Sequence, residues 1–206
     1  KLRVLDNEVY FGRYTSGYSY KGYMNSSMQR HGHGKLVDEK NQLIYLGGWQ
    51  KDVRHGEGKE CKLPLIISGY WENDQLHSGL VRNVDTGDLY DGNIQSNTLL
   101  PHGHGVLSCR NGQLYSGCWN QGCLNNGKLV YPNGDVYYGS FRSRLRHGTG
   151  KLISYDKHQT LEGEWVDDYL HGHGVSRIYF PVHGTDNGFM TPVDYLNIEV
   201  DNQIDK

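Results

Sequence analysis

The sequence has no long apolar stretch and no excess of basic residues. Apolar residues make up 36% of the 206 residues, and no run approaches the roughly 20 that a bilayer-spanning helix needs. The N-terminus lacks the charged-then-apolar pattern of a signal peptide, although the chain opens without a methionine and reads as an excised piece. A formal net charge of −2 at pH 7 disfavours a general nucleic-acid binder.

Cysteine is also scarce, with four residues in the whole chain. They form no CxxC pair and recur at no common spacing, so neither a disulfide framework nor a zinc site is indicated. We interpret them as reduced thiols of a cytoplasmic protein, with a location at a membrane or the cytoskeleton as the alternative. The four are Cys61, Cys109, Cys118 and Cys123.

Motifs of enzyme active sites are absent from the sequence. There is no Gly-x-Ser-x-Gly nucleophile elbow, no phosphate-cradling loop and no His-Glu-x-x-His pair. The many glycine pairs are periodic and follow no strand-to-helix signal, which disfavours phosphate binding. The sequence therefore predicts that this chain is not an enzyme and holds no cofactor.

Glycine and tyrosine are abundant, with 28 and 16 residues, and they recur in a fixed pattern. Residues 45–49 read Tyr-Leu-Gly-Gly-Trp, and residues 55–58 read His-Gly-Glu-Gly. The template is thus aromatic-x-Gly-x-aromatic, a short polar run, and His-Gly-x-Gly. Its central glycines lie 22 to 25 residues apart, which indicates a repeat array. They are Gly22, Gly47, Gly69, Gly92, Gly117, Gly139 and Gly163.

Each copy of the template predicts two β-strands. In the first strand, positions one, three and five share one face because side chains alternate across a strand. The intervening positions are mostly polar or small, as a half-buried antiparallel strand requires. His-Gly-x-Gly begins the return strand. We therefore predict an all-β fold, a single-layer curved antiparallel sheet that grows by one hairpin per copy.

The glycines need a physical reason, since glycine weakens a strand interior. A glycine between two aromatic residues on one face leaves room for rings of a neighbouring strand to lie over the backbone. The paired glycines after the histidine permit dihedral angles that a side chain would forbid, at a bend or bulge.

These motifs resemble the MORN-repeat family (membrane occupation and recognition nexus), whose units of about 23 residues carry Tyr-x-Gly-x-Trp followed by His-Gly-x-Gly. The resemblance covers residues 10–174. It implies a scaffold that binds protein segments along a groove. Members of the family also occur beside catalytic domains, so an enzyme elsewhere in a longer protein is compatible with the resemblance.

The array has predicted ends and an irregular middle. We assign residues 1–19 to an N-terminal capping hairpin, 20–180 to about seven repeats, and 181–206 to a C-terminal loop and capping strand, with an interface strand as the alternative. The copies that begin at Ile67, Tyr90 and Tyr115 depart from the template. We expect bulges there, and we expect Pro64 to shorten the return strand before Ile67.

Histidine pairs recur as His-Gly-His and are the main candidates for metal ligands. Each pair would place two imidazoles on one strand face, but no cysteine or carboxylate follows with matching spacing. The first histidine of each pair is simply the template residue. We therefore predict structural histidines and no metal site. The pairs are His31 with His33, His102 with His104, and His171 with His173.

The aromatic face is the predicted functional site. Rings in a groove are good interface anchors because they offer large contact area and few rotamers to freeze. Most of these rings must stack on one another as the core of the sheet. A single layer nevertheless has no second layer to cover that face completely, so we predict a groove lined with tyrosine and tryptophan that binds a helix or extended peptide of a partner protein. The predicted groove residues are Tyr20, Tyr45, Trp49, Trp71, Tyr90, Tyr115, Trp119, Tyr137, Phe141 and Trp165.

Two alternatives remain open at this point. The first is a phosphoinositide or membrane-surface adaptor, with Arg142, Arg144, Arg146 and Lys151 as the anionic-lipid contact. The second is a structural module that forms a homodimer through its terminal units. No nucleic acid is expected as a partner.

Overall fold

The described part of the chain consists of strands and turns. A computed structural model describes residues 9–156, 158–178 and 198–199, and no helix occurs among them. No helix in these ranges therefore has the length and apolar character needed to cross a membrane. The predicted all-β fold class is confirmed.

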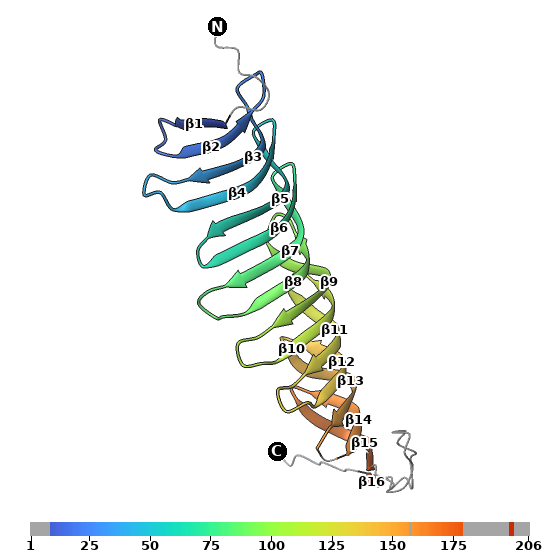
Figure 1. Cartoon of the computed structure of the whole chain (residues 1–206). Helices are drawn as coiled ribbons and strands as arrows, with labels where there is room; N and C mark the ends of the chain where they lie inside the picture. Colours follow the sequence, from blue (N-terminus) through green and yellow to red (C-terminus); the bar gives the residue numbers. More distant parts are fainter. Residues whose placement is uncertain (1–8, 157, 179–197, 200–206) are drawn as a thin grey trace, which may run out of the picture. The chain divides into compact units, whose positions relative to one another are not determined.

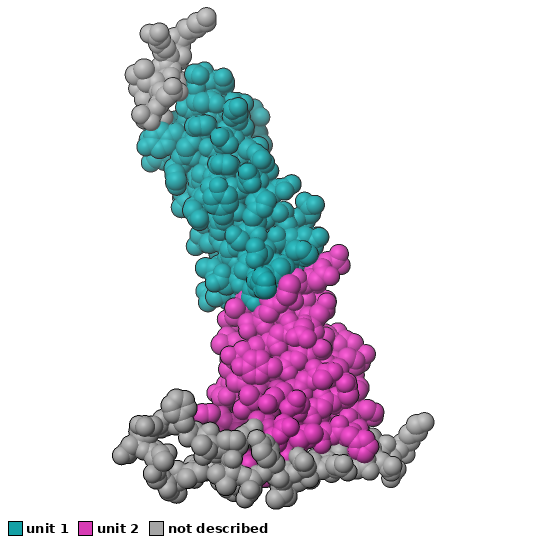
Figure 2. All heavy atoms as spheres, turned by 90° about the vertical axis from the view of Figure 1, so that its right-hand side faces the viewer, with its two compact units in different colours: residues 1–105 teal, residues 106–206 magenta. Residues whose placement is uncertain are grey.

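The chain divides into two compact units, residues 1–105 and 106–206 (Figure 2). In the first unit each strand from β1 to β8 pairs antiparallel with the next. Strand β9 (Leu100–Ser108) starts in the first unit and ends in the second. The strands of the first unit are β1 (Val9–Arg13), β2 (Ser19–Met24), β3 (Arg30–Val37), β4 (Leu43–Gln50), β5 (Val53–Lys62), β6 (Leu65–Glu72), β7 (Gln75–Asn83) and β8 (Leu89–Gln95).

The second unit repeats this arrangement, and its strands from β10 to β16 also pair in sequence order. Within each unit the strands curve and form one layer (Figure 1). The strands of the second unit are β10 (Leu114–Asn120), β11 (Cys123–Val130), β12 (Val136–Arg142), β13 (Leu145–Ser154), β14 (Gln159–Val166), β15 (Tyr169–Ile178) and β16 (Ile198–Glu199).

Each repeat is one hairpin, as predicted. The aromatic-x-Gly-x-aromatic segment, with its looser copies, forms the even-numbered strands β2 to β14, and the His-Gly-x-Gly segment, or its variants in β7 and β11, lies near the start of the odd-numbered return strands β3 to β15. The central glycine of the first strand faces a glycine of the return strand, for example Gly47 opposite Gly58. The template positions therefore lie in aligned rows across each unit.

Five hairpins close with a two-residue turn in which both residues have positive φ. In Lys51-Asp52 the φ angles are 51° and 70°, which is the type I′ geometry that matches strand twist. The sequence suggested five turn-prone residues here, but strand pairing continues up to Gln50 and resumes at Val53. The other four turns are Asn73-Asp74, Gln121-Gly122, Ser143-Arg144 and Asp167-Asp168.

A register shift occurs in the hairpin of every repeat whose pairing is described. It lies between Gly47 and Trp49 in β4, and at the equivalent place in β2, β6, β10, β12 and β14. Bulges do occur in the copies that begin at Ile67 and Tyr115, as predicted, but they do not distinguish these copies, because the bulge belongs to the template itself. Where His-Gly-x-Gly is complete, its first glycine has positive φ, as at Gly56 (77°), and permits the bend, whereas Ser78 and Asn126 stand at that position in β7 and β11.

The ends of the array are described in part. Strands β1 and β2 form the expected N-terminal hairpin, closed by a hydrogen bond from Tyr14 N to Tyr18 O (2.7 Å). Residues 181–197 of the predicted C-terminal segment lie outside the described residues. Within it only β16 is described, and it pairs with Val175 and Ser176 of β15. Pro64 does not shorten β5, which has ten residues, because Pro64 lies in the turn that follows.

Candidate functional site

The ten aromatic residues predicted to line a groove are all buried. Their exposed fractions range from 0 to 6%. Edge-on contacts run from repeat to repeat: the Tyr45 ring centroid is 5.0 Å from that of Trp49 and 5.7 Å from that of Trp71. In the second unit Tyr137 contacts Phe141 (5.2 Å) and Trp165 (5.5 Å) in the same manner. The interpretation of these rings as the core of the sheet therefore holds for all ten, because they pack on one another, and their burial does not support a role as partner contacts.

The glycine pair of a repeat is covered by a tyrosine of the same repeat. The ring of Tyr45 lies over Gly47 and Gly58, and a Cβ added at Gly58 would lie 2.1 Å from the Tyr45 hydroxyl oxygen. That hydroxyl donates a hydrogen bond to the carbonyl oxygen of Gly48 (3.2 Å). The glycines do leave room for a ring, but the ring over the central glycine Gly47 comes from its own strand, and only for Gly58 does it come from a neighbouring strand.

Burial changes the acidity of these tyrosines. It raises the pKa of Tyr20, Tyr45, Tyr115 and Tyr137 to about 12, because removing the hydroxyl from water disfavours the phenolate. These four side chains are therefore neutral hydrogen-bond donors at physiological pH.

Three repeats cover their glycines with a leucine instead. The leucine stands directly before the histidine position of the return strand. The side chain of Leu124 lies over Gly117 and Gly127, and Tyr115, although present, bonds to the carbonyl oxygen of Arg144 (3.3 Å). A leucine thus excludes the tyrosine ring from the space above the glycines. The three residues are Leu76, Leu124 and Leu170.

Arginine occupies the same position in three other repeats and connects each of them to the next one. The backbone N–H and the Nε of Arg54 donate to Asp74 Oδ1 (2.8 and 2.9 Å), and its Nη2 donates to the Asp74 carbonyl oxygen (2.9 Å). Asp74 is the second residue of the next type I′ turn. We call this contact the arginine link. It recurs as Arg30 with Asp52 and as Arg146 with Asp168.

Each linking guanidinium also lies on a tryptophan ring of the next repeat. The Arg30 Cζ is 4.0 Å from the Trp49 ring centroid, and Arg54 is 4.1 Å from Trp71. Cation–π contacts of this kind contribute roughly 0.5–2 kcal/mol. Arg146 lies 4.2 Å from Trp165 in the second unit. In each arginine link, the guanidinium group therefore covers one face of a tryptophan ring of the core.

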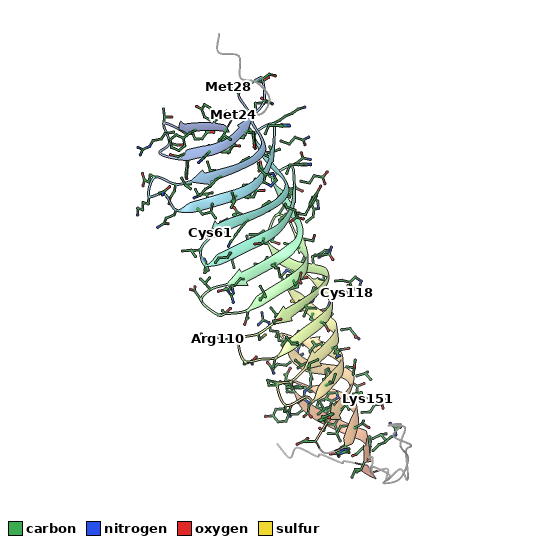
Figure 3. All side chains as sticks on the ribbon, in the orientation of Figure 1. Met24, Met28, Cys61, Arg110, Cys118 and Lys151 are labelled. Carbon is green, nitrogen blue, oxygen red and sulfur yellow. The ribbon has the colours of Figure 1, made fainter. Side chains whose placement is uncertain are left out.

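Three of the four cationic residues predicted to contact lipid have carboxylate partners, and the fourth, Arg144, is the second residue of the Ser143-Arg144 turn. Arg142 pairs with Asp167 (2.9 Å), Arg146 with Asp168 (3.0 Å), and Lys151, labelled in Figure 3, with Glu162 (3.8 Å). These pairs neutralise much of the local positive charge. Nothing in this arrangement favours an anionic headgroup over the carboxylates already in place.

One open hollow lies on the ring side of the first unit, with a volume of about 440 Å³. Its lining is Tyr14, Tyr18, Arg30, Leu36 and Asp52. Tyr14 and Tyr18 come from the N-terminal turn and are 39% and 41% exposed, unlike the core rings. Burial raises the pKa of Tyr14, an effect opposed by the positive charge of Arg30, so its hydroxyl is a neutral donor. Sequence analysis did not single out Tyr14 or Tyr18.

The arginine link was also missed by sequence analysis, although a signal for it exists. Arg30 and Asp52 are 22 residues apart, as are Arg146 and Asp168, and Arg54 and Asp74 are 20 apart. This spacing is close to the repeat length. An arginine and an aspartate that recur at one repeat interval would have predicted a contact between neighbouring repeats.

The histidines and cysteines assemble no metal site in the part of the chain that the structure describes. No group of three or more His, Cys, Asp or Glu side chains there is close enough to hold a metal ion. His31, His33, His102, His104, His171 and His173 are all exposed. The four cysteines form no disulfide.

Comparison with known proteins agrees with this architecture. The MORN repeat family matches residues 29–41, 45–61, 100–114, 115–136, 137–159 and 162–177, about half of the chain. Alsin from mouse and from human is 28% identical over 137 residues, which is 64% of this chain. The chain spans about 7% of the length of these curated relatives. The family that matches is a repeat and not an enzyme family. With its hairpins, glycine pairs and ring core all in the template positions, this chain belongs to the MORN-repeat family.

Proposed function

We propose that this MORN module is a protein-interaction scaffold that binds a segment of a partner protein, and that it acts by binding and not by catalysis. The observation that carries this proposal is the hollow lined by Tyr14, Tyr18 and Arg30. Tyrosine and arginine are enriched among the residues that dominate binding energy at interfaces. The ring core beneath is the rigid support of the site, and its buried rings do not themselves contact the partner.

The chemistry of the hollow suits a peptide segment. Two half-exposed tyrosine rings offer apolar faces, and Leu36 adds an aliphatic surface. The bonds of Arg30 to Asp52 use its backbone N–H, Nε and Nη2, so the hydrogens on Nη1 have no protein acceptor among the described residues. A carbonyl oxygen of a bound peptide is a suitable acceptor for them.

A photocrosslinking experiment tests this proposal. We replace Tyr18 by a benzophenone amino acid in cells and identify the proteins that become covalently attached. Tyr155, which is 76% exposed and lies in the second unit, is the matched control position. The proposal expects a protein captured from position 18 and not from 155, with capture lost on Tyr14→Ala. Capture of the same proteins from both positions would refute it.

We favour the lipid-surface function less than the scaffold function, because Arg142, Arg146 and Lys151, which suggested it, are paired with carboxylates. Sedimentation of the chain with vesicles that contain a phosphoinositide tests it directly. Salt-sensitive binding that is lost on Arg142→Ala with Arg144→Ala would favour it over the scaffold function. Sedimentation equilibrium without lipid tests the homodimer.

A further inference from the structure

The face of the first unit opposite the ring core carries a row of lysines at strand spacing. Strand pairing places Lys21 opposite Lys35, Lys35 opposite Leu46, and Leu46 opposite Lys59. Phe11 extends the row on β1. We call Lys21, Lys35 and Lys59 the lysine row. All three are exposed, as are Leu46 (47%) and Phe11 (72%).

No ion pair within the described residues includes one of the three ammonium groups of the lysine row. Glu57 lies on the same face of β5 as Lys59, two residues or about 7 Å along the strand, and forms no ion pair with a lysine. Asp91 is the first acidic residue in the row, and it lies three strands beyond Lys59. That separation is about 14 Å, longer than the Debye length of about 8 Å at physiological salt.

In the second unit, the lysines at the same template position have interaction partners. Lys128 and Lys151 correspond to Lys35 and Lys59 in the repeat. Lys151 pairs with Glu162, directly opposite on the next strand (3.8 Å), and Lys128 lies 5.6 Å from the Tyr138 ring centroid. The first unit places a second lysine, Lys21, opposite Lys35 instead. Like charges directly opposite each other destabilise a sheet, so this arrangement has a cost in the unbound protein.

A hollow of about 160 Å³ adjoins the first two lysines of the row. Phe11, Lys21, Lys35 and Asn41 are among its lining residues. It is large enough for one side chain and too small for a large ligand. An anionic group held there would contact both ammonium groups, and the apolar part that carries it would contact Phe11.

We propose that the lysine row binds an extended acidic segment of a partner protein. One carboxylate of the segment lies between Lys21 and Lys35, and a second contacts Lys59. The carboxylate between Lys21 and Lys35 lies about two and a half strands from Lys59, roughly 12 Å, which is close to the length of four residues of extended chain. Because side chains alternate in an extended chain, the segment has acidic residues four positions apart and, midway between them on the same face, an apolar residue that contacts Leu46. This surface is separate from the hollow at Tyr14, and either site binds without the other.

A peptide fits this surface better than a membrane does. Leu46 separates Lys35 from Lys59 at strand spacing, and the hollow accepts a single side chain. These features match the regular spacing of a polypeptide. A lipid surface requires no such spacing, and it serves below as the competing outcome.

Fluorescence anisotropy with a labelled peptide tests the proposal. The peptide has two glutamates four positions apart with a leucine midway between them, and its control has glutamines in place of the glutamates. The expected result is salt-sensitive binding of the glutamate peptide alone. Binding weakens about tenfold in the Lys21→Gln, Lys35→Gln double variant, the sum of two exposed ion pairs. Lys62→Gln is the matched control, because Lys62 is an exposed lysine on the other face of β5.

Three outcomes would overturn the proposal. The glutamine peptide could bind equally, Lys62→Gln could weaken binding as much as the double variant, or anionic vesicles could bind while neither peptide does. A stability measurement adds a check that needs no ligand. Because Lys35 faces Lys21, Lys35→Gln raises the melting temperature of the unbound chain, and a lower melting temperature would show that the row is structural.

Discussion

Hairpins β4–β5 and β6–β7 follow one template but cover their glycine pairs with different side chains. In β4–β5 the Tyr45 ring lies over Gly47 and Gly58, and Arg54 is free to reach the next repeat. In β6–β7 the first aromatic position holds Ile67, which is too short to cover the glycines, and Leu76 covers Gly69. The residue directly before the histidine position of the return strand therefore determines the outcome. An arginine there connects the repeat to its successor through an arginine link, and a leucine there covers the glycines of its own repeat.

The second unit shows that this position, and not the aromatic residue, controls the outcome. Tyr115 is present in its repeat, yet Leu124 lies over the glycines and Tyr115 points elsewhere. Where Arg146 replaces leucine in the following repeat, Tyr137 again lies over Gly139 and Gly150. The tyrosine takes the space above the glycines only when no leucine is there.

The largest expected loss of stability comes from a substitution that fills the space over a glycine. Gly58→Ala places a Cβ 2.1 Å from the Tyr45 hydroxyl, so the ring must leave, and we expect a loss of about 3 kcal/mol. Gly174→Ala is the matched change in a leucine-covered repeat. Its Cβ lies 2.9 Å from the flexible tip of Leu170, and we expect less than about 1 kcal/mol. Urea denaturation measures both, and equal losses would remove the distinction between the two kinds of repeat.

A smaller effect follows from breaking an arginine link. Arg54→Ala keeps the backbone N–H bond to Asp74 but removes two side-chain hydrogen bonds to Asp74, an ion pair with Glu60 (3.0 Å) and the contact with Trp71. We expect a loss of about 2 kcal/mol. The control is Arg142→Ala, because that residue makes an exposed pair with Asp167 and should cost below about 1 kcal/mol. A loss at position 54 no larger than at 142 would show that the link is not stabilising.

Tryptophan substitutions give a finer comparison. The indole Nε1 of Trp49 donates to the carbonyl oxygen of Gly34 (3.2 Å), whereas the Trp71 Nε1 is buried without a protein acceptor. Trp49→Phe should therefore cost about 1 kcal/mol more than Trp71→Phe, the net value of one hydrogen bond. Thermal unfolding of the two variants measures the difference. The reverse order would mean that the Trp71 indole has an acceptor that the protein does not supply, such as a water molecule.

Removing a buried tyrosine hydroxyl should have the smallest effect on stability at neutral pH, and this effect becomes visible only at alkaline pH. The pKa of Tyr45 and of Tyr115 is about 12 in the folded protein, above the ordinary value of 10, so the stability that these hydroxyls contribute is complete below pH 10. It falls as the pH rises toward 12, because the unfolded chain releases its protons first. Tyr45→Phe and Tyr115→Phe should each make the alkaline loss shallower, as measured by urea midpoints from pH 8 to 11. A steeper loss in either variant would contradict the direction of the shift.

The hairpins could be predicted from the sequence because the template is periodic. Alternation placed Tyr45, Gly47 and Trp49 on one face, and that is where they lie. The pattern could identify the inward face but not what covers it, so the rings were also predicted to line a groove, whereas they bury one another. Side-chain direction decides this, and Tyr45 reaches back over its own strand.

Other features depend on contacts that a single repeat does not contain. The type I′ turn at Lys51-Asp52 has no glycine, so its residues gave no hairpin signal, and strand twist imposes the geometry. The arginine link joins residues of successive repeats, and the basic residues of the turns were interpreted one by one. The hollow requires Tyr14 and Tyr18 of the terminal hairpin to lie beside Arg30. None of these could follow from the period alone.

The arginine link has a direction, since an arginine of one repeat always reaches the turn aspartate of the repeat that follows. A contact of this head-to-tail kind can be repeated from each copy to the next, so the link itself sets no limit on copy number. Protein engineers could splice additional copies between Arg54 and Asp74 and extend the sheet by about 10 Å for each one. The carboxylate that accepts the hydrogen bonds of the arginine also belongs to the turn, as Asp74 does. Replacing such a turn with Asn-Gly would therefore keep the hairpin and remove the carboxylate of the arginine link.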